Sequence, residues 1–375
     1  MPTDFQPAPD LTLSGFPFVA ALADSADPQD RRIWLRVACD HFVLAGRADA
    51  RAIERFADAV GRQLETADRA AVLEAARKLA PCPRTPARLL DRLADADPEA
   101  SDCVLEHGRA FTSADLVGAI GRGSRQALAV ARRPGLDSRL IGALVARDEA
   151  DILVALADNP GARLQGAVVA GLMRRARALA EDRGDRRLAE SLLRRRPLGP
   201  EHAALFLLAD PPQRVEILIA AQRDRLGRPR GLPAAAAPQT IEALELAAVA
   251  RQPRLFVATL AKALGCGEAL AQRIADDPSG EPLAVALAAL GAPGEVVVRV
   301  LIAGDLAAGG AYGRIRSLAR LNSALDRNAA MAVMAALCGQ PARRRTDGPA
   351  EAALREPAAR RRERAAIRPQ RKAAG

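Results

Sequence analysis

Apolar residues in this chain recur with the spacing of short helices and not with the period of two that marks strands. The segments Leu128–Ala131 and Val154–Ala157 match position by position in apolar and alanine residues, 26 residues apart. Each segment runs into a Pro-Gly pair, at Pro134-Gly135 and at Pro160-Gly161. Self-similarity at about 20–50 residues is typical of stacked repeat proteins. The pattern therefore predicts short helices that bury their apolar faces against neighbouring repeats.

The repeat extends to both sides of these two segments. Arg88–Leu93 matches Arg139–Leu144 at an offset of 51, close to two periods. A period of 26, less about six turn residues, leaves two helices of about ten residues, each about 15 Å long. Three predicted helices begin at capping residues: Thr85 followed by Pro86, Thr112 with Asp115 as a capping box, and Asp137.

The same spacing indicates which residues are buried. A first helix begins near Asp27-Pro28, and in it Ile33, Val37, His41 and Leu44 share one face, with Trp34 beside them. Another helix is predicted from Gly199 to Leu208. Eight residues of the repeats are predicted to be core: Leu89, Leu93, Leu116, Ile120, Leu140, Leu144, Val154 and Leu156.

Composition agrees with an all-α fold. Hydrophobic residues make up 49% of the chain and aromatic residues only 3%, and Ala and Leu, which dominate the apolar set, favour helices. The richest apolar run, Leu283–Leu290, is far shorter than the roughly 18 residues that span a bilayer. We therefore expect a core helix there and no membrane span.

Breaks in the pattern divide the chain. Residues 227–239 hold three prolines and two glycines, which predicts a linker. The predicted parts are a flexible N-terminus at 1–26, N-terminal helices and repeats at 27–226, the linker at 227–239, a second helical domain at 240–340 and a disordered Arg-rich tail at 341–375.

The five cysteines are an odd number, none is part of a CxxC pair, and the chain opens without a signal-peptide pattern. We therefore expect a cytoplasmic protein.

Positive charge is concentrated in the tail. Residues 341–375 contain eleven basic and four acidic side chains, so they carry +7 of the net +10. Arginines also cluster before the breaking prolines and on one long predicted helix. The candidate contacts with a partner or with phosphate groups are Arg132, Arg133, Arg174, Arg175, Arg195, Arg196, Arg343, Arg344, Arg345, Arg360, Arg361 and Arg362. For the clusters before prolines, we favour the simpler interpretation that cations stabilise helix C-termini.

Signatures of catalysis are missing from the sequence. It contains no GxxxxGK[ST] loop, no HExxH and no GxSxG. Two Cys/His pairs could ligate a metal: Cys39 with His41, whose spacing points them apart on a helix, and Cys103 with His107, whose spacing gives them one face. A structural zinc site needs about four ligands. We therefore expect no catalytic site, no metal and no cofactor.

Several of these phrases together resemble a known family. The segments Ala127–Leu136, Ala157–Ala162 and Arg194–Leu198, followed later by Asp277–Gly291, are similar to an alphaproteobacterial family of HEAT-like repeat proteins catalogued as domain of unknown function 2336. The resemblance spans roughly residues 28–340. It implies an all-helical solenoid in a bacterial cytoplasm and carries over no active site.

The resulting prediction is a HEAT-like α-solenoid, a right-handed stack of short helical pairs followed by a second helical domain. Repeat geometry without catalytic residues favours a non-catalytic scaffold that binds a protein partner. The alternative is a nucleic-acid-binding solenoid that uses a basic face, the Arg-rich tail, or both. The sequence identifies neither the protein partner nor the oligomeric state.

Overall fold

The computed structural model describes residues 11, 13, 14, 16–45, 48–227, 235–306 and 312–339. All regular structure within these ranges is helical, which confirms the all-α prediction. The chain divides into two compact units, Met1–Ile217 and Leu218–Gly375. The division falls within helix α13 (Pro211–Gly227), before the predicted linker, of which residues 228–234 lie outside the described ranges.

The N-terminal unit is built from consecutive short helices. They are α1 (Pro17–Ala21), η1 (Leu22–Asp24), α2 (Pro28–Leu44), α3 (Ala50–Leu64), α4 (Arg69–Leu79), α5 (Ala87–Ala96), α6 (Pro98–His107), α7 (Ser113–Arg122), α8 (Ser124–Ala131), α9 (Ser138–Ala146), α10 (Ala150–Asp158), α11 (Gly166–Arg183), α12 (Arg187–Arg194) and the 3₁₀ helix η2 (Pro200–Leu205).

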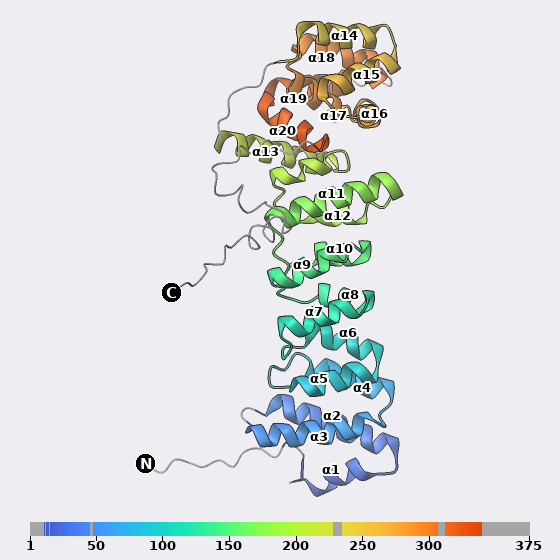
Figure 1. The fold of residues 1–375 in the computed structure, drawn as a ribbon, viewed down its shortest axis with the longest axis vertical. Helices are drawn as coiled ribbons and strands as arrows, with labels where there is room; N and C mark the ends of the chain where they lie inside the picture. The colour runs from blue at the N-terminus through green and yellow to red at the C-terminus, as the bar shows by residue number, and fades with distance from the viewer. Residues whose placement is uncertain are drawn as a thin grey trace, which may run out of the picture. The chain divides into compact units, whose positions relative to one another are not determined.

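These helices form two rows. From α2 to α12, each even-numbered helix contacts the next even-numbered one. In the other row, α3 packs on α5, α7 on α9, and α9 on α11. Neighbours in the chain, such as α5 with α6 and α7 with α8, join the rows into tiers that follow one another in chain order (Figure 1). Each tier thus buries its apolar side against its neighbours, as the repeat predicts.

The predicted core of the repeats is confirmed at seven of its eight positions. Every one of them except Val154 is buried. Val154 is only half-buried, because Ile152, Leu153 and Leu156 turn the inward face of α10 away from it. The spacing thus predicted the helix correctly and missed its rotation at this residue.

Capping residues set the helix starts, with one correction. Thr112 and Asp115 form the predicted capping box, and Asp137 accepts a hydrogen bond from the Leu140 N–H at 2.8 Å. The prediction that Thr85 caps α5 is wrong. Pro86 occupies the cap position, and the buried Thr85 hydroxyl donates instead to the Leu79 carbonyl at 2.7 Å. Thr85 therefore ties α5 back to the end of α4.

Helix α2 buries a different face from the one the spacing singled out. Ile33, Val37 and Leu44 are exposed, whereas the inward face carries Trp34, Leu35, Ala38, Cys39 and Phe42. Phe42 stacks on Phe56 of α3, with ring centroids 4.1 Å apart and planes 5° from parallel. Two faces of α2 are apolar, and the one with the large aromatic rings buries more surface.

The C-terminal unit surrounds one helix, α17, that is buried beyond its first residue. Its elements are α14 (Pro238–Val249), α15 (Pro253–Leu264), α16 (Glu268–Ala275), α17 (Glu281–Leu290), α18 (Gly294–Leu301), the π-helix η3 (Ile302–Leu306), α19 (Tyr312–Ala324) and α20 (Arg327–Leu337). Every residue from Pro282 to Leu290 is buried, because α15, α16, α18, α19 and α20 all contact α17. The predicted core helix at Leu283–Leu290 is confirmed.

One predicted α-helix is a tighter structure. Within the predicted segment from Gly199 to Leu208, only Pro200–Leu205 is helical, as the 3₁₀ helix η2, and residues 206–208 form a turn. His202 within it is buried, and its Nδ1 accepts a hydrogen bond from the Gly199 N–H at 3.0 Å. The ring also bonds the Leu192 carbonyl, so η2 is fixed to α12 through a neutral imidazole.

Burial lowers the pKa of His202 below that of an unfolded histidine. The unfolded chain therefore binds more protons at acid pH, and the stability that the neutral ring contributes is lost as the pH falls below about 6.5. We expect the unfolding free energy, measured by urea denaturation, to fall by up to about 1.4 kcal/mol per pH unit more in the wild type than in His202→Gln. Parallel pH profiles for the two proteins would contradict this assignment.

Candidate functional site

Helix C-termini in the even-numbered row are closed by side chains from the next tier. The last carbonyl groups of a helix have no partner within it. At the end of α6, the Arg133 guanidinium donates from Nη1 to the Leu105 carbonyl at 2.5 Å and from Nη2 to the Gly108 carbonyl at 2.7 Å. Burial lowers the pKa of Arg133. This arginine therefore satisfies backbone groups of its own chain.

Asn159 takes the same role one repeat later. It stands 26 residues after Arg133, and its Nδ2 donates to the carbonyls of Ala131 at 2.8 Å and Arg133 at 2.7 Å. Its Oδ1 accepts from the Gly161 N–H at 2.8 Å. The side chain is only 7% exposed, so α8 and α10 are joined by a buried amide.

Arg195 repeats the contact at the end of α10. Its Nη1 donates to the carbonyls of Ala157 at 2.9 Å and Asn159 at 2.8 Å, and its Nη2 donates to that of Ala162 at 2.6 Å. The sequence separation grows to 33–38 residues because the long helix α11 is inserted. We call Arg133, Asn159 and Arg195, with the carbonyls they bond, the carbonyl seam.

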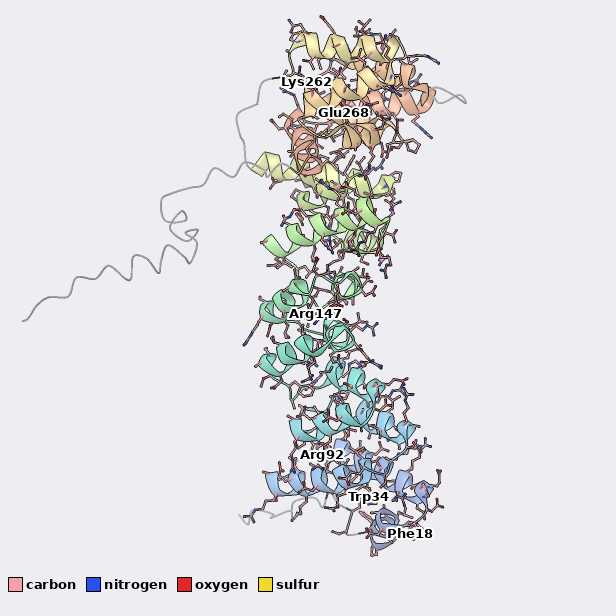
Figure 2. All side chains as sticks on the ribbon, turned by 45° about the vertical axis from the view of Figure 1, so that its right-hand side comes forward. Phe18, Trp34, Arg92, Arg147, Lys262 and Glu268 are labelled. Carbon is pink, nitrogen blue, oxygen red and sulfur yellow. The ribbon has the colours of Figure 1, made fainter. Side chains whose placement is uncertain are left out.

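The odd-numbered row has a related contact. Arg147 follows α9 in this row (Figure 2). Its Nη1 donates to the Ile120 carbonyl near the end of α7 at 3.2 Å. The same guanidinium forms an ion pair with Glu149. Side chains from one tier thus bond the helix ends of the preceding tier in both rows.

The remaining candidate arginines divide into paired and exposed groups. Arg175 pairs with Asp148 at 2.8 Å, and Arg196 pairs with Glu216. Arg132 and Arg174 are exposed. The six tail candidates lie outside the described residues: Arg343, Arg344, Arg345, Arg360, Arg361 and Arg362. Four of the six described candidates therefore contact their own chain.

The two Pro-Gly pairs that revealed the repeat lie against one another. A Cβ atom on Gly161 would stand 2.9 Å from the Gly135 nitrogen and 3.4 Å from the Pro134 Cα. A side chain at this position would push the turns apart. The glycine therefore permits the close spacing on which the Asn159 bonds depend.

The two cysteine–histidine pairs differ in how deeply their cysteines are buried. Cys103 and His107 line an open surface hollow of about 510 Å³ between α4 and α6, next to Arg77. Cys39 is buried, which raises the pKa of its thiol to about 12. No three His, Cys, Asp or Glu side chains among the described residues are placed to hold a metal ion. The described helices also include none that is long and apolar enough to cross a membrane.

The outer side of α7 and α9 carries small residues that are not among the candidates predicted from the sequence. Ala114, Gly118, Gly121, Gly142 and Ala146 are all exposed, and we call them the α7–α9 face. Around each of the three glycines, the space that a Cβ would enter is empty to 4 Å. An exposed glycine inside a helix lowers stability by about 1 kcal/mol relative to alanine. The sequence feature that could have revealed this face is therefore the presence of three glycines, each of which lowers helix stability, within two helices of about ten residues.

Comparison with known proteins identifies one family. The family model described as an uncharacterised protein conserved in bacteria (DUF2336) matches residues 101–335, from within α6 to within α20. Neither the curated proteins nor the solved structures gave a match.

The seam predicts a large effect from one amide. Asn159→Leu keeps the size of the side chain but leaves the Ala131 and Arg133 carbonyls and the Gly161 N–H without their partner. We expect the free energy of unfolding in urea to fall by about 2–4 kcal/mol. The adjacent Asp158 forms an exposed pair with Arg194 at 2.8 Å, and Asp158→Ala should change the same quantity by less than about 1 kcal/mol. If both variants lost the same free energy of unfolding, the hydrogen bonds of Asn159 would not be a major source of stability.

Proposed function

The chain belongs to DUF2336, a family of uncharacterised proteins conserved in bacteria, and we propose that it is a non-catalytic, HEAT-like scaffold that binds a protein partner. The observation that carries the proposal is the α7–α9 face. Three exposed glycines there forgo about 1 kcal/mol each of helix stability, and open space stands in place of a side chain. Because the described residues leave that space open, we infer that a partner fills it.

The chemistry of the face favours a helical protein segment. Glycine and alanine allow a second helix to approach closely, and α7 and α9 contact each other, so their outer sides adjoin. Arg122 and Arg139 are exposed on the same two helices. We therefore propose a partner helix with small apolar residues at its centre and carboxylates at its margin.

The use of arginine within the N-terminal unit supports a protein partner over a polyanion on this body. Arg133 and Arg195 donate to backbone carbonyls, and Arg175 and Arg196 pair with acids of the chain. Groups engaged in this way contribute little to phosphate binding. We also propose a cytoplasmic location, which suits a protein whose five cysteines are all thiols.

A second candidate function rests on a separate observation, the +7 charge of residues 341–375. An arginine-rich arm of this kind binds duplex nucleic acid through phosphates without reading sequence. This function would reside in the tail and not in the tiers.

For the scaffold, we expect the double substitution Gly118→Glu and Gly142→Glu to abolish partner binding without loss of fold. Both side chains enter open space, and helix propensity should raise the melting temperature slightly. The measurement is quantitative affinity capture from bacterial lysate, with the wild type, the double variant and Gly294→Glu as baits.

Gly294 is the matched control, since it is also exposed with open space around it but lies on α18. Proteins retained by the wild type and by Gly294→Glu should be depleted at least tenfold with the double variant. An identical set of captured proteins for all three baits would refute the α7–α9 face as the binding surface.

For the second function, we expect a fluorescent DNA duplex to bind the full chain with an affinity that falls steeply between about 50 and 200 mM salt. A chain that ends at residue 340 should lose that binding, because most of the net positive charge is gone. Binding that survives the truncation, or that ignores salt, would exclude the tail as a nucleic-acid arm.

A further inference from the structure

Two cysteines far apart in the sequence meet in the C-terminal unit. Cys266 lies in the turn between α15 and α16, directly after Gly265, whose φ of +66° ends α15. Cys338 is the cap residue at the end of α20. Both cysteines therefore sit at helix ends, where the backbone adjusts more readily than within a helix.

Their contacts bring the two sulfur atoms together. The Cys338 thiol donates to the Leu264 carbonyl with a separation of 3.8 Å, two residues before Cys266. The Cys266 and Cys338 side chains also share a hydrogen bond. Both residues are partly exposed, so small oxidants can reach them.

The other three cysteines differ in place and surroundings. Cys39 and Cys82 are buried, and Cys103 lies partly exposed on α6. All three belong to the N-terminal unit. Cys103 thus has an exposure similar to that of the pair but a position in the other unit.

We propose that Cys266 and Cys338 are a redox modification site, at which a peroxide forms a reversible disulfide that fastens the end of α20 to the α15–α16 turn. This inference is independent of the scaffold function. The disulfide would close a loop over residues 266–338 and so reduce the conformational entropy of the unfolded chain.

The chemistry balances in two steps with hydrogen peroxide as the oxidant. The Cys338 thiolate attacks one peroxide oxygen, so an S–O bond forms, the O–O bond breaks, and the departing hydroxide takes a proton to become water. The Cys266 sulfur then attacks the sulfenic sulfur, the S–S bond forms, and the S–O bond breaks. The second hydroxide leaves with the Cys266 proton, so two thiols are oxidised and one peroxide is reduced to two waters.

Burial raises the pKa of Cys266 above that of a free thiol. Cys266 therefore forms little thiolate at neutral pH, which is consistent with its not being the sulfur that attacks the peroxide first. It also means that the reaction should be tested at mildly alkaline pH, about 8.5, where thiolate is more abundant.

The test uses the full chain, treated with stoichiometric hydrogen peroxide, blocked with iodoacetamide and digested with trypsin without reduction. We expect peptide Ala263–Arg273 joined to peptide Asn328–Arg343 in the mass spectrum, and the two separate peptides after dithiothreitol. The melting temperature of the oxidised wild type should rise by about 5 °C or more. Cys338→Ser and Cys266→Ser should show no such rise.

Cys103→Ser is the matched control, and it should keep both the cross-link and the temperature shift. If the two cysteines are recovered alkylated, over-oxidised or joined between molecules, the proposal is wrong. It also fails if Cys338→Ser retains the temperature shift.

Discussion

The tiers of the N-terminal unit depend on how the ends of short helices satisfy their carbonyl groups. A helix of about ten residues leaves four carbonyls without partners, a large share of its backbone. In the even-numbered row these groups receive hydrogen bonds from Arg133, Asn159 and Arg195 of the following tier. The ends of α6, α8 and α10 thus obtain hydrogen-bond donors from the tier that follows. Apolar burial brings the tiers together, and the carbonyl seam fixes their register.

This requirement explains why arginines precede the breaking prolines. The sequence leads to a choice between helix-dipole complementation and an external phosphate. In the structure the guanidinium of Arg133 crosses to the preceding tier and bonds the end of α6. Charge near a helix C-terminus is involved, but the helix is not the one that the arginine follows. At the neighbouring position Arg132 is exposed, and nothing in the sequence separates the two.

Local patterns predicted local structure well. The 26-residue period, the capping box at Thr112 and the apolar run at Leu283–Leu290 each correspond to a feature of the structure. Contacts between residues far apart in the sequence were harder to predict. Helix α2 has two apolar faces, and only the position of Phe56 on α3 shows which one is buried. The meeting of Cys266 and Cys338 depends on the packing of a whole unit and leaves no trace in residue spacing.

In the carbonyl seam, Asn159 joins α8 to α10 with an amide, whereas the contacts before and after it use the arginines Arg133 and Arg195. An amide reaches less far than a guanidinium and carries no charge, so the Pro-Gly turns at 134–135 and 160–161 must come into direct contact for its bonds to form. Arg195 spans its gap with three bonds from a long, flexible side chain. The contact between α8 and α10 is therefore expected to be stiffer than the neighbouring contacts, which long arginine side chains bridge. If a force bent the N-terminal unit, we expect the tiers joined by Arg133 and Arg195 to move apart before the tiers joined by Asn159.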